Sequence, residues 1–117
     1  MAVQPNLRFA PPPGGTGVGA WQYGTMALLD NAQIDEFTTS HSGWERDGDS
    51  IVRTFEFDDF VGSMGFVTRV ALRAEKANHH PDIDIRWNEV TLRLSTHSEG
   101  GLTEKDTTLA AEIDALA

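Results

Sequence analysis

Alternation of apolar and polar residues predicts a first β-hairpin between positions 44 and 57. The odd-numbered positions from 51 to 57 include three bulky apolar side chains, whereas the even-numbered ones are Val52, Thr54 and Glu56. A period of two is typical of a half-buried β-strand. Residues 44–46 precede this strand across Asp47-Gly48-Asp49, and an Asp-Gly pair favours a tight hairpin turn.

A second alternating stretch, between positions 83 and 96, predicts another hairpin. Apolar residues stand at 83, 85 and 87, a turn is expected near Asn88-Glu89, and the even-numbered residues of 90–94 are apolar again. We interpret Trp87 as a core residue, because its strand is apolar at alternate positions. The opposite face of the last strand would carry Thr91, Arg93, Ser95 and His97. Gly100-Gly101 ends the strand.

Helical periodicity appears in three places. Asp30 can cap a short helix containing Ile34 and Phe37, and Thr103 can cap a final helix. The inward stripe of that final helix is predicted to comprise Leu109, Ile113 and Leu116. The longest helix is expected over residues 59–77, and it must stop near Asn78 because Pro81 disfavours helical geometry in the residue before it.

Apolar residues occur on two faces of the longest predicted helix. We interpret as its buried stripe the set Phe60, Met64, Val67, Ala71 and Ala74. Phe66 and Val70 lie off that stripe and would form a second apolar surface, compatible with contact to another subunit. Gly62 and Gly65 each weaken the helix by about 1 kcal/mol relative to Ala. They reflect either sequence drift or close packing against another helix or subunit.

Together these elements predict an α+β fold in the order α-β-β-α-β-β-α. About four antiparallel strands would form one sheet, with the helices packed on one of its faces. Residues 1–25 differ in composition, because they hold four of the five prolines and many glycines. We expect them to be a flexible Pro/Gly-rich N-terminal arm or a remnant of cloning, and residues 26–117 to be the folded part.

Composition and charge exclude several classes of protein. The net charge of −9 disfavours sequence-independent binding of nucleic acid and adhesion to an anionic membrane surface. The chain has 0 cysteines, which excludes disulfides and thiolate metal sites. It has no apolar run near the ~20 residues of a membrane span and no secretory signal pattern. We therefore expect a cytoplasmic protein.

The candidate chemistry lies in the stretch EKANHHPDIDIRW, residues 75–87. His79 and His80 stand side by side at a predicted helix-to-strand junction, and His97 ends a strand that can lie beside it. Three interpretations are open from the residues alone. The histidines could bind a metal with a carboxylate, they could cap backbone groups, or they could act as acid and base near neutral pH. The carboxylates available to a metal are Asp82, Asp84 and Asp106, but no recognised spacing such as His-Glu-x-x-His is present.

One family has this pattern. Its members carry an acidic or other polar residue, then three further residues and His-His-Pro, followed by an aromatic residue, a histidine and an aspartate. Here the matching positions are Glu75, His79-His80-Pro81, Trp87, His97 and Asp106. The chain from about Met26 onward therefore resembles the pterin-4a-carbinolamine dehydratase family, which includes a dimerisation cofactor of a homeodomain transcription factor. Asn78 and Lys105 depart from an acidic residue and an arginine found in several members.

The resemblance implies one dehydratase-like domain over residues 26–117. Its implied substrate is 4a-hydroxytetrahydrobiopterin, from which water is eliminated to give quinonoid dihydropterin in tetrahydrobiopterin recycling. No metal or organic cofactor is expected. The implied catalytic residues are His79, His80 and His97. The implied substrate-binding residues are Pro81, Ser95, Thr96, Asp106 and Glu75. Which histidine acts as acid and which as base stays open.

The resemblance also implies partners. The family forms homodimers or homotetramers, and no direct contact with nucleic acid or membrane is expected. An alternative reading is a non-enzymatic role on the same fold, as a transcriptional cofactor or a carboxylase-assembly factor. Relatives that lost catalysis would be expected to lose the histidines, and all three are present here.

Overall fold

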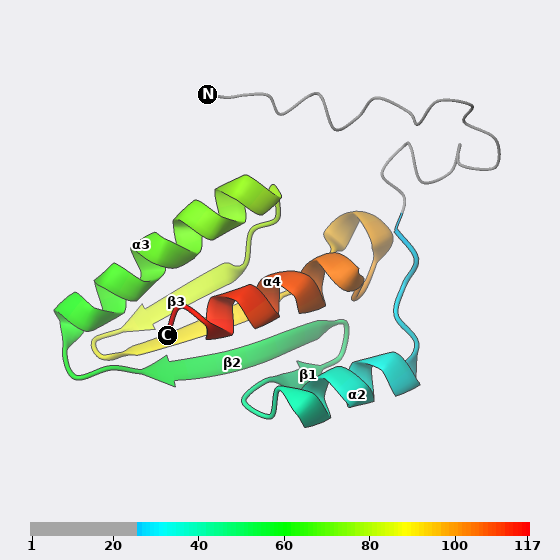
Figure 1. Ribbon diagram of the computed structural model, residues 1–117, viewed down its shortest axis with the longest axis horizontal. Coiled ribbons are helices and arrows are strands. Elements are labelled where there is room, and N and C mark those ends of the chain that lie inside the picture. Colours follow the sequence, from blue (N-terminus) through cyan, green and yellow to red (C-terminus); the bar gives the residue numbers. More distant parts are fainter. Residues whose placement is uncertain (1–25) are drawn as a thin grey trace.

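The computed structural model describes residues 26–117, which form three α-helices and four strands (Figure 1). In chain order the elements are α2 (Asn31–Ser40), β1 (Glu45–Asp47), β2 (Ser50–Glu56), α3 (Phe60–Ala77), β3 (Asp82–Arg86), β4 (Glu89–Leu94), a turn of 3-10 helix η2 (His97–Glu99) and α4 (Glu104–Asp114). The predicted order α-β-β-α-β-β-α is confirmed. The prediction of an N-terminal arm at residues 1–25 lies outside the described residues.

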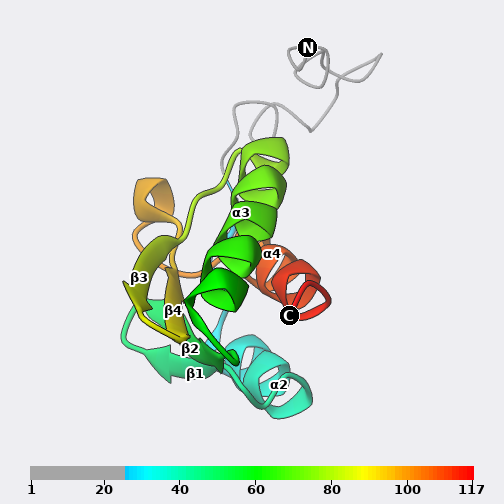
Figure 2. The same ribbon diagram turned by 90° about the vertical axis from the view of Figure 1, so that its left-hand side faces the viewer.

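The four strands form one antiparallel sheet in the order β1-β2-β4-β3. Its centre is the β2–β4 pair, in which Ile51 lies opposite Leu94 and Phe55 opposite Val90. Figure 2 shows α2, α3 and α4 on one side of this sheet. The core lies between the two layers, and the opposite face is polar, as the Thr54–Thr91 hydroxyl contact of 2.8 Å illustrates. The predicted α+β architecture is therefore confirmed.

The long helix α3 buries a different face from the predicted one. Phe66 and Val70 are buried, together with Ser63. Of the predicted stripe, Ala74 is buried and Val67 is partly buried, whereas Phe60, Met64 and Ala71 are exposed. Both sets recur at helical spacing, so periodicity alone could not rank them. Packing against the sheet layer selects the buried face, because the Phe66 ring packs against the rings of Phe55 and Phe57 at centroid distances of 4.7 and 4.9 Å. The prediction that Phe66 and Val70 form a second, subunit-facing surface was wrong.

Trp87 was also predicted wrongly. Its side chain is 67% exposed, and its φ of 54° places it in the left-handed region at the β3–β4 turn. The turn consists of Trp87 and Asn88, one residue earlier than predicted. Asn88 holds it there, since its carbonyl accepts from the Phe57 N–H at 2.8 Å and its side-chain amide donates to the Phe57 carbonyl at 3.1 Å.

A carboxylate at the end of α4 connects this helix to the first hairpin and to the residue before it. The Asp114 carboxylate accepts from the Trp44 indole N–H at 2.9 Å and from the Arg53 guanidinium at 3.0 Å. Trp44 is itself buried in the core. Within residues 26–117, none of the helices is long and apolar enough to cross a bilayer.

Candidate active site

Three segments converge on one hollow of about 300 Å³, which we call the histidine hollow. They are the α3–β3 junction, the end of β4 with η2, and the first turn of α4. The hollow is lined by Asn78, His79, His80, Ser95, Thr96, His97, Ser98 and Lys105. The structure thus brings the three predicted catalytic histidines together with Ser95 and Thr96, although His97 is 17 or more positions from the other two in the sequence.

The end of α3 sets the directions of the adjacent histidines. Asn78 has a φ of 52° and caps the helix in the left-handed conformation, where Asn is tolerated better than most residues. The His79 N–H then donates to the Ala74 carbonyl at 3.1 Å. The following residue, His80, leads into the extended backbone that Pro81 favours. As a result the His79 side chain is 10% exposed and that of His80 is 55% exposed.

His79 is held by a fully buried carboxylate. Its Nε2 lies 2.5 Å from Oδ1 of Asp106, which is also the third residue of the α4 capping box. The second carboxylate oxygen, Oδ2, accepts from the Thr96 hydroxyl at 2.7 Å and from the Thr103 N–H at 2.9 Å. Because the carboxylate only accepts, Nε2 of a neutral His79 carries the proton and Nδ1 is left as the acceptor.

Two buried threonines extend this network, and each of its hydrogen bonds is donated toward Asp106. The Thr96 hydroxyl gives its single hydrogen to Asp106, so it must accept from the Thr103 hydroxyl, 2.8 Å away. The Thr103 hydroxyl accepts in turn from the Lys105 N–H at 3.2 Å. The sequence suggested Thr103 only as a helix cap. Its additional link to Asp106 through Thr96 could not be recognised without the spatial meeting of β4 and α4.

The other predicted site residues are less enclosed. Nε2 of His80 lies 2.5 Å from Oε2 of Glu75, but Glu75 is 77% exposed, so solvent screens this pair. The His97 ring is exposed and makes no hydrogen bond within residues 26–117. Pro81 follows the histidines without lining the hollow, and the Ser95 hydroxyl donates away from it, to the Asp49 carbonyl at 2.7 Å. Ser98 and Lys105 line the hollow and were not predicted as site residues.

A metal centre was one of the three readings open at the level of sequence. No group of three or more His, Asp or Glu side chains in the described part of the chain is arranged to hold an ion. Asp82 and Asp84 lie on the exposed face of edge strand β3, opposite Arg93 and Thr91, rather than at the histidine hollow.

Comparison with known families agrees with this arrangement. The model of the pterin 4 alpha carbinolamine dehydratase family matches residues 27–116. This chain belongs to that family. The predicted family resemblance is therefore confirmed.

Two relatives show how far the likeness extends along the chain. A protein of Roseiflexus castenholzii, provisionally named a pterin-4-alpha-carbinolamine dehydratase, is 54% identical over 88 residues, 75% of this chain and 95% of its own. A Thermomicrobium roseum protein with the same provisional name is 52% identical over 92 residues, which cover 79% of this chain and 99% of that protein.

Solved structures of the same fold carry more than one role in their names. The Brucella melitensis transcriptional coactivator/pterin dehydratase is 36% identical, with a TM-score of 0.75 over 78% of this chain and 99% of that one. A pterin dehydratase-like protein identified as a RuBisCO assembly factor in the alpha-carboxysome is 26% identical, with a TM-score of 0.57 over 66% of this chain and 92% of that one. The fold alone therefore does not decide between catalysis and assembly.

Proposed function

We propose that the protein is a 4a-hydroxytetrahydrobiopterin dehydratase, a hydro-lyase that eliminates water from 4a-hydroxytetrahydropterin in tetrahydrobiopterin recycling. The observation that carries this proposal is the meeting of three histidines at one hollow, with a buried carboxylate behind one of them. An assembly or coactivator role requires no such arrangement. Family membership and the names of the relatives support the same activity.

The reaction needs one acid and one base. The C4a–O bond breaks, and the leaving hydroxide takes a proton and departs as water. N5 loses its proton, and the N5–H electron pair forms the new N5=C4a double bond. Each positioned proton transfer contributes about 10²–10⁴-fold, and imidazole is suited to both near neutral pH. No electron acceptor or external reactant is required.

His79 and His97 are the principal pair in this proposal, and His80 assists at the leaving hydroxyl. Asp106 acts through His79 by fixing its orientation and tautomer. Thr96 supports Asp106 rather than the pterin, since its side chain is buried and its hydroxyl is already engaged on both sides. Ser95 lines the hollow, Pro81 favours the extended backbone directly after the histidines, and Glu75 contacts His80.

The test is the rate at which enzymatically generated 4a-hydroxytetrahydropterin loses water, followed by absorbance. His79→Ala and His97→Ala are each expected to lower kcat/KM by about 100-fold or more. His41→Ala is the matched control, because the fourth histidine stacks on Phe37 away from the hollow and should retain the wild-type rate. A folded wild-type protein that fails to exceed the spontaneous rate would reject the enzyme and leave a binding or assembly role.

We also propose that the protein is a homo-oligomer that pairs through the outer face of α3. Val61, Gly65, Thr68 and Leu72 recur there at helical spacing, and Leu72 is 69% exposed. A Cβ added at Gly65 would meet nothing closer than the Arg69 guanidinium at 3.5 Å, so another helix could approach closely. Two large apolar side chains on this face, Val61 and Leu72, are therefore left exposed by the described residues, which favours contact with a second copy.

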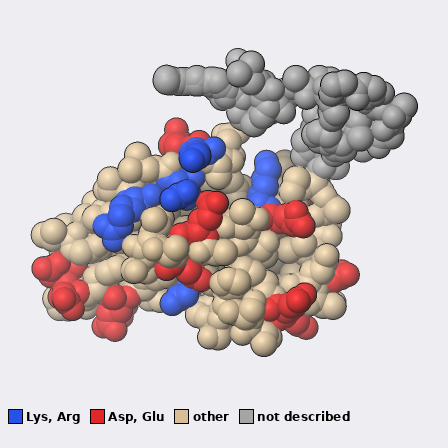
Figure 3. All heavy atoms as spheres, in the orientation of Figure 1, with Lys and Arg blue, Asp and Glu red and all other residues tan. Residues whose placement is uncertain are grey.

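The charges along α3 favour an antiparallel pair of two copies. Figure 3 shows Lys and Arg side chains in a row over this helix, and the residues concerned are Arg69, Arg73 and Lys76. Asp58 and Asp59 stand at its opposite end. Antiparallel pairing therefore places the basic half of each helix beside the acidic start of the other, which attracts at both ends.

Leu72→Glu should shift the mass measured by light scattering toward the monomer. Leu28→Glu introduces the same charge at another exposed leucine, outside α3, and should leave the mass unchanged. A wild-type protein that remains monomeric at concentrations near 100 µM, well above the ~1 µM Kd of a modest interface, would reject this pairing.

A further inference from the structure

A groove lined by three cations lies between α3 and the end of α4. It consists of two adjoining hollows of about 300 and 240 Å³. Arg73 and Lys76 line both hollows, so they stand at the centre of what we call the basic groove. The outer hollow is completed by Arg69, Leu72 and Leu116, and the inner one by Ala77 and Glu112.

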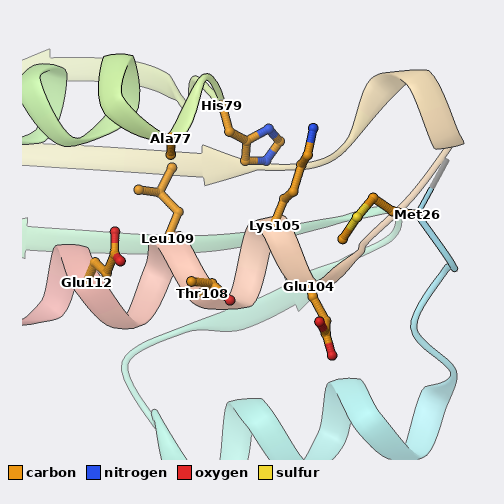
Figure 4. A pocket seen from close by; sticks show the side chains of 8 residues that line it. All are labelled: Met26, Ala77, His79, Glu104, Lys105, Thr108, Leu109 and Glu112. Carbon is orange, nitrogen blue, oxygen red and sulfur yellow. The ribbon is translucent and has the colours of Figure 1, made fainter. Parts of the chain in front are cut away.

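The inner end of the basic groove adjoins the candidate active site. Ala77 and Glu112 also line the hollow drawn in Figure 4, where they lie at the end away from Met26. His79 lines that same hollow. The basic groove itself contains none of the three histidines, so it is a separate place on the surface.

The cations of this groove contrast with the charge of the whole chain. The protein has a net charge of −9 and only nine Lys and Arg residues, and three of the nine are here. Three other arginines each pair with an aspartate, namely Arg53, Arg86 and Arg93. The three cations of the groove form no ion pair within residues 26–117. They repel one another, so an anion placed between them would be stabilised by all three.

Two of these cations have a structural role, and the third has none. Arg69 donates to the Leu116 carbonyl from Nε at 3.3 Å and from Nη2 at 3.2 Å, which caps the end of α4. Lys76 lies in the last turn of α3, where a cation is stabilised by the helix dipole. Arg73 is partly buried and has no carboxylate partner in the part of the chain that the structure describes. A guanidinium held in this way is suited to an incoming anion.

The surroundings favour a compact anion over an extended acidic chain. Acidic side chains border the row of Lys and Arg in Figure 3, and the Glu112 carboxylate stands at the inner end of the groove. A ligand charged along its whole length would lie against these carboxylates. A phosphate group between Arg73 and Lys76 would avoid them, and it can accept two parallel hydrogen bonds from a guanidinium as well as bind an ammonium group.

We propose that the basic groove binds a phosphate-bearing small molecule. Its phosphate or diphosphate lies between Arg73 and Lys76, and its uncharged polar part points toward Glu112. Arg69 contributes the guanidinium hydrogens that its bonds to Leu116 do not use. The inference goes beyond the dehydratase reaction and does not depend on it, because no histidine takes part.

The probe is inorganic diphosphate, titrated into the full-length protein at constant ionic strength and followed by calorimetry and ¹H–¹⁵N NMR. The wild-type protein should bind it with a Kd below about 1 mM, with amide shifts in α3 and at the end of α4. A tenfold excess over Kd should raise Tm by roughly 5–10 °C. Arg73→Gln and Lys76→Gln should each weaken binding by about tenfold or more, the effect of one charged hydrogen bond.

Matched variants separate the groove from the general charge of the protein. Arg86→Gln removes the same charge from an exposed position on β3 and should keep the wild-type Kd. Glu112→Gln removes the repelling carboxylate at the inner end and should strengthen binding a few-fold. Circular dichroism confirms that each variant is folded.

Three outcomes would overturn the inference. Binding that is weakened as much by Arg86→Gln as by Arg73→Gln reflects net charge alone. Tighter binding of a hexaglutamate peptide than of diphosphate overturns the selected chemistry. The absence of a saturable shift at about ten times the expected Kd overturns the site, and the row of cations then serves only the proposed pairing of α3 helices.

Discussion

The Asp106→Asn substitution gives the sharpest test of the proposed histidine geometry, because it changes one atom of a fully buried side chain. Both protein donors at Oδ2, the Thr96 hydroxyl and the Thr103 N–H, require an oxygen there. The amide oxygen of Asn is therefore fixed at that position, and its NH₂ group faces His79. An NH₂ group donates, so Nε2 must become an acceptor and the ring proton must move to Nδ1.

This change of tautomer reverses the role of the open nitrogen of His79. Nδ1 becomes a donor and can no longer take a proton from the substrate, so kcat should fall by about 10²–10⁴-fold. The variant should also be less stable. Each of three bonds, at 2.5, 2.7 and 2.9 Å, loses its charged acceptor. At about 1 kcal/mol per bond, unfolding should become easier by roughly 2–3 kcal/mol.

The dehydration rate should be measured well below the melting temperature of the variant, with ¹⁵N NMR of His79 to observe the tautomer. Asp114→Asn is the control, because this carboxylate also lies on α4 and also accepts two hydrogen bonds, from Trp44 and Arg53, far from the hollow. It should lower stability and retain the rate. A folded Asp106→Asn protein with kcat within about threefold of wild type would refute the tautomer argument.

Three further predictions concern the threonine network, the face of α3 and the β3–β4 turn. Thr103→Val should lower the free energy of unfolding by about 1–3 kcal/mol and reduce kcat more than it changes KM, because Thr96 loses the donor that orients it. Thr103→Ser keeps the hydroxyl and should restore both the stability and kcat. Phe66→Ala should lower the free energy of unfolding in urea by about 3–5 kcal/mol, and Met64→Ala should lower it by less than about 1 kcal/mol. The opposite order would show that the face of α3 with Met64 packs in the core. Trp87→Asn should stabilise the protein by about 1 kcal/mol, because Asn tolerates the left-handed region; a loss of stability in the same unfolding assay would show that the indole ring packs.

Sequence patterns predicted the order of elements well because their boundaries carry local signals. Asp59 accepts from the Gly62 N–H at 2.8 Å to begin α3, and Asn78 ends it. The buried face of α3, in contrast, could not be predicted from local signals. Apolar residues surround much of this helix, and only the positions of Phe55 on β2 and of Phe57 directly after β2 select the face with Phe66. That choice depends on contacts distant in sequence.

Part of the candidate site could be named from the sequence, but its hydrogen-bond connections could not. The His-His-Pro motif, His97 and Asp106 could be named from family resemblance, and the structure brings the histidines to one hollow. The link from Thr103 through Thr96 to Asp106 joins the end of β4 to the start of α4. Local signals predicted the cap at Thr103, but they contain no information on which side chain from another element would meet it.

The pairing of β2 with β4 at the centre of the sheet also has a consequence for folding kinetics. Each hairpin can form from neighbouring residues, on the order of microseconds. Ile51 and Leu94, in contrast, meet only after the segment between them, including α3, has closed into a loop. Closing such a loop is entropically unfavourable before its contacts form, so we expect hairpin docking to limit the folding rate. A chain emerging from the ribosome would then remain without its central strand pair until β4 has been synthesised, and its apolar β2 would be exposed to chaperones in the meantime.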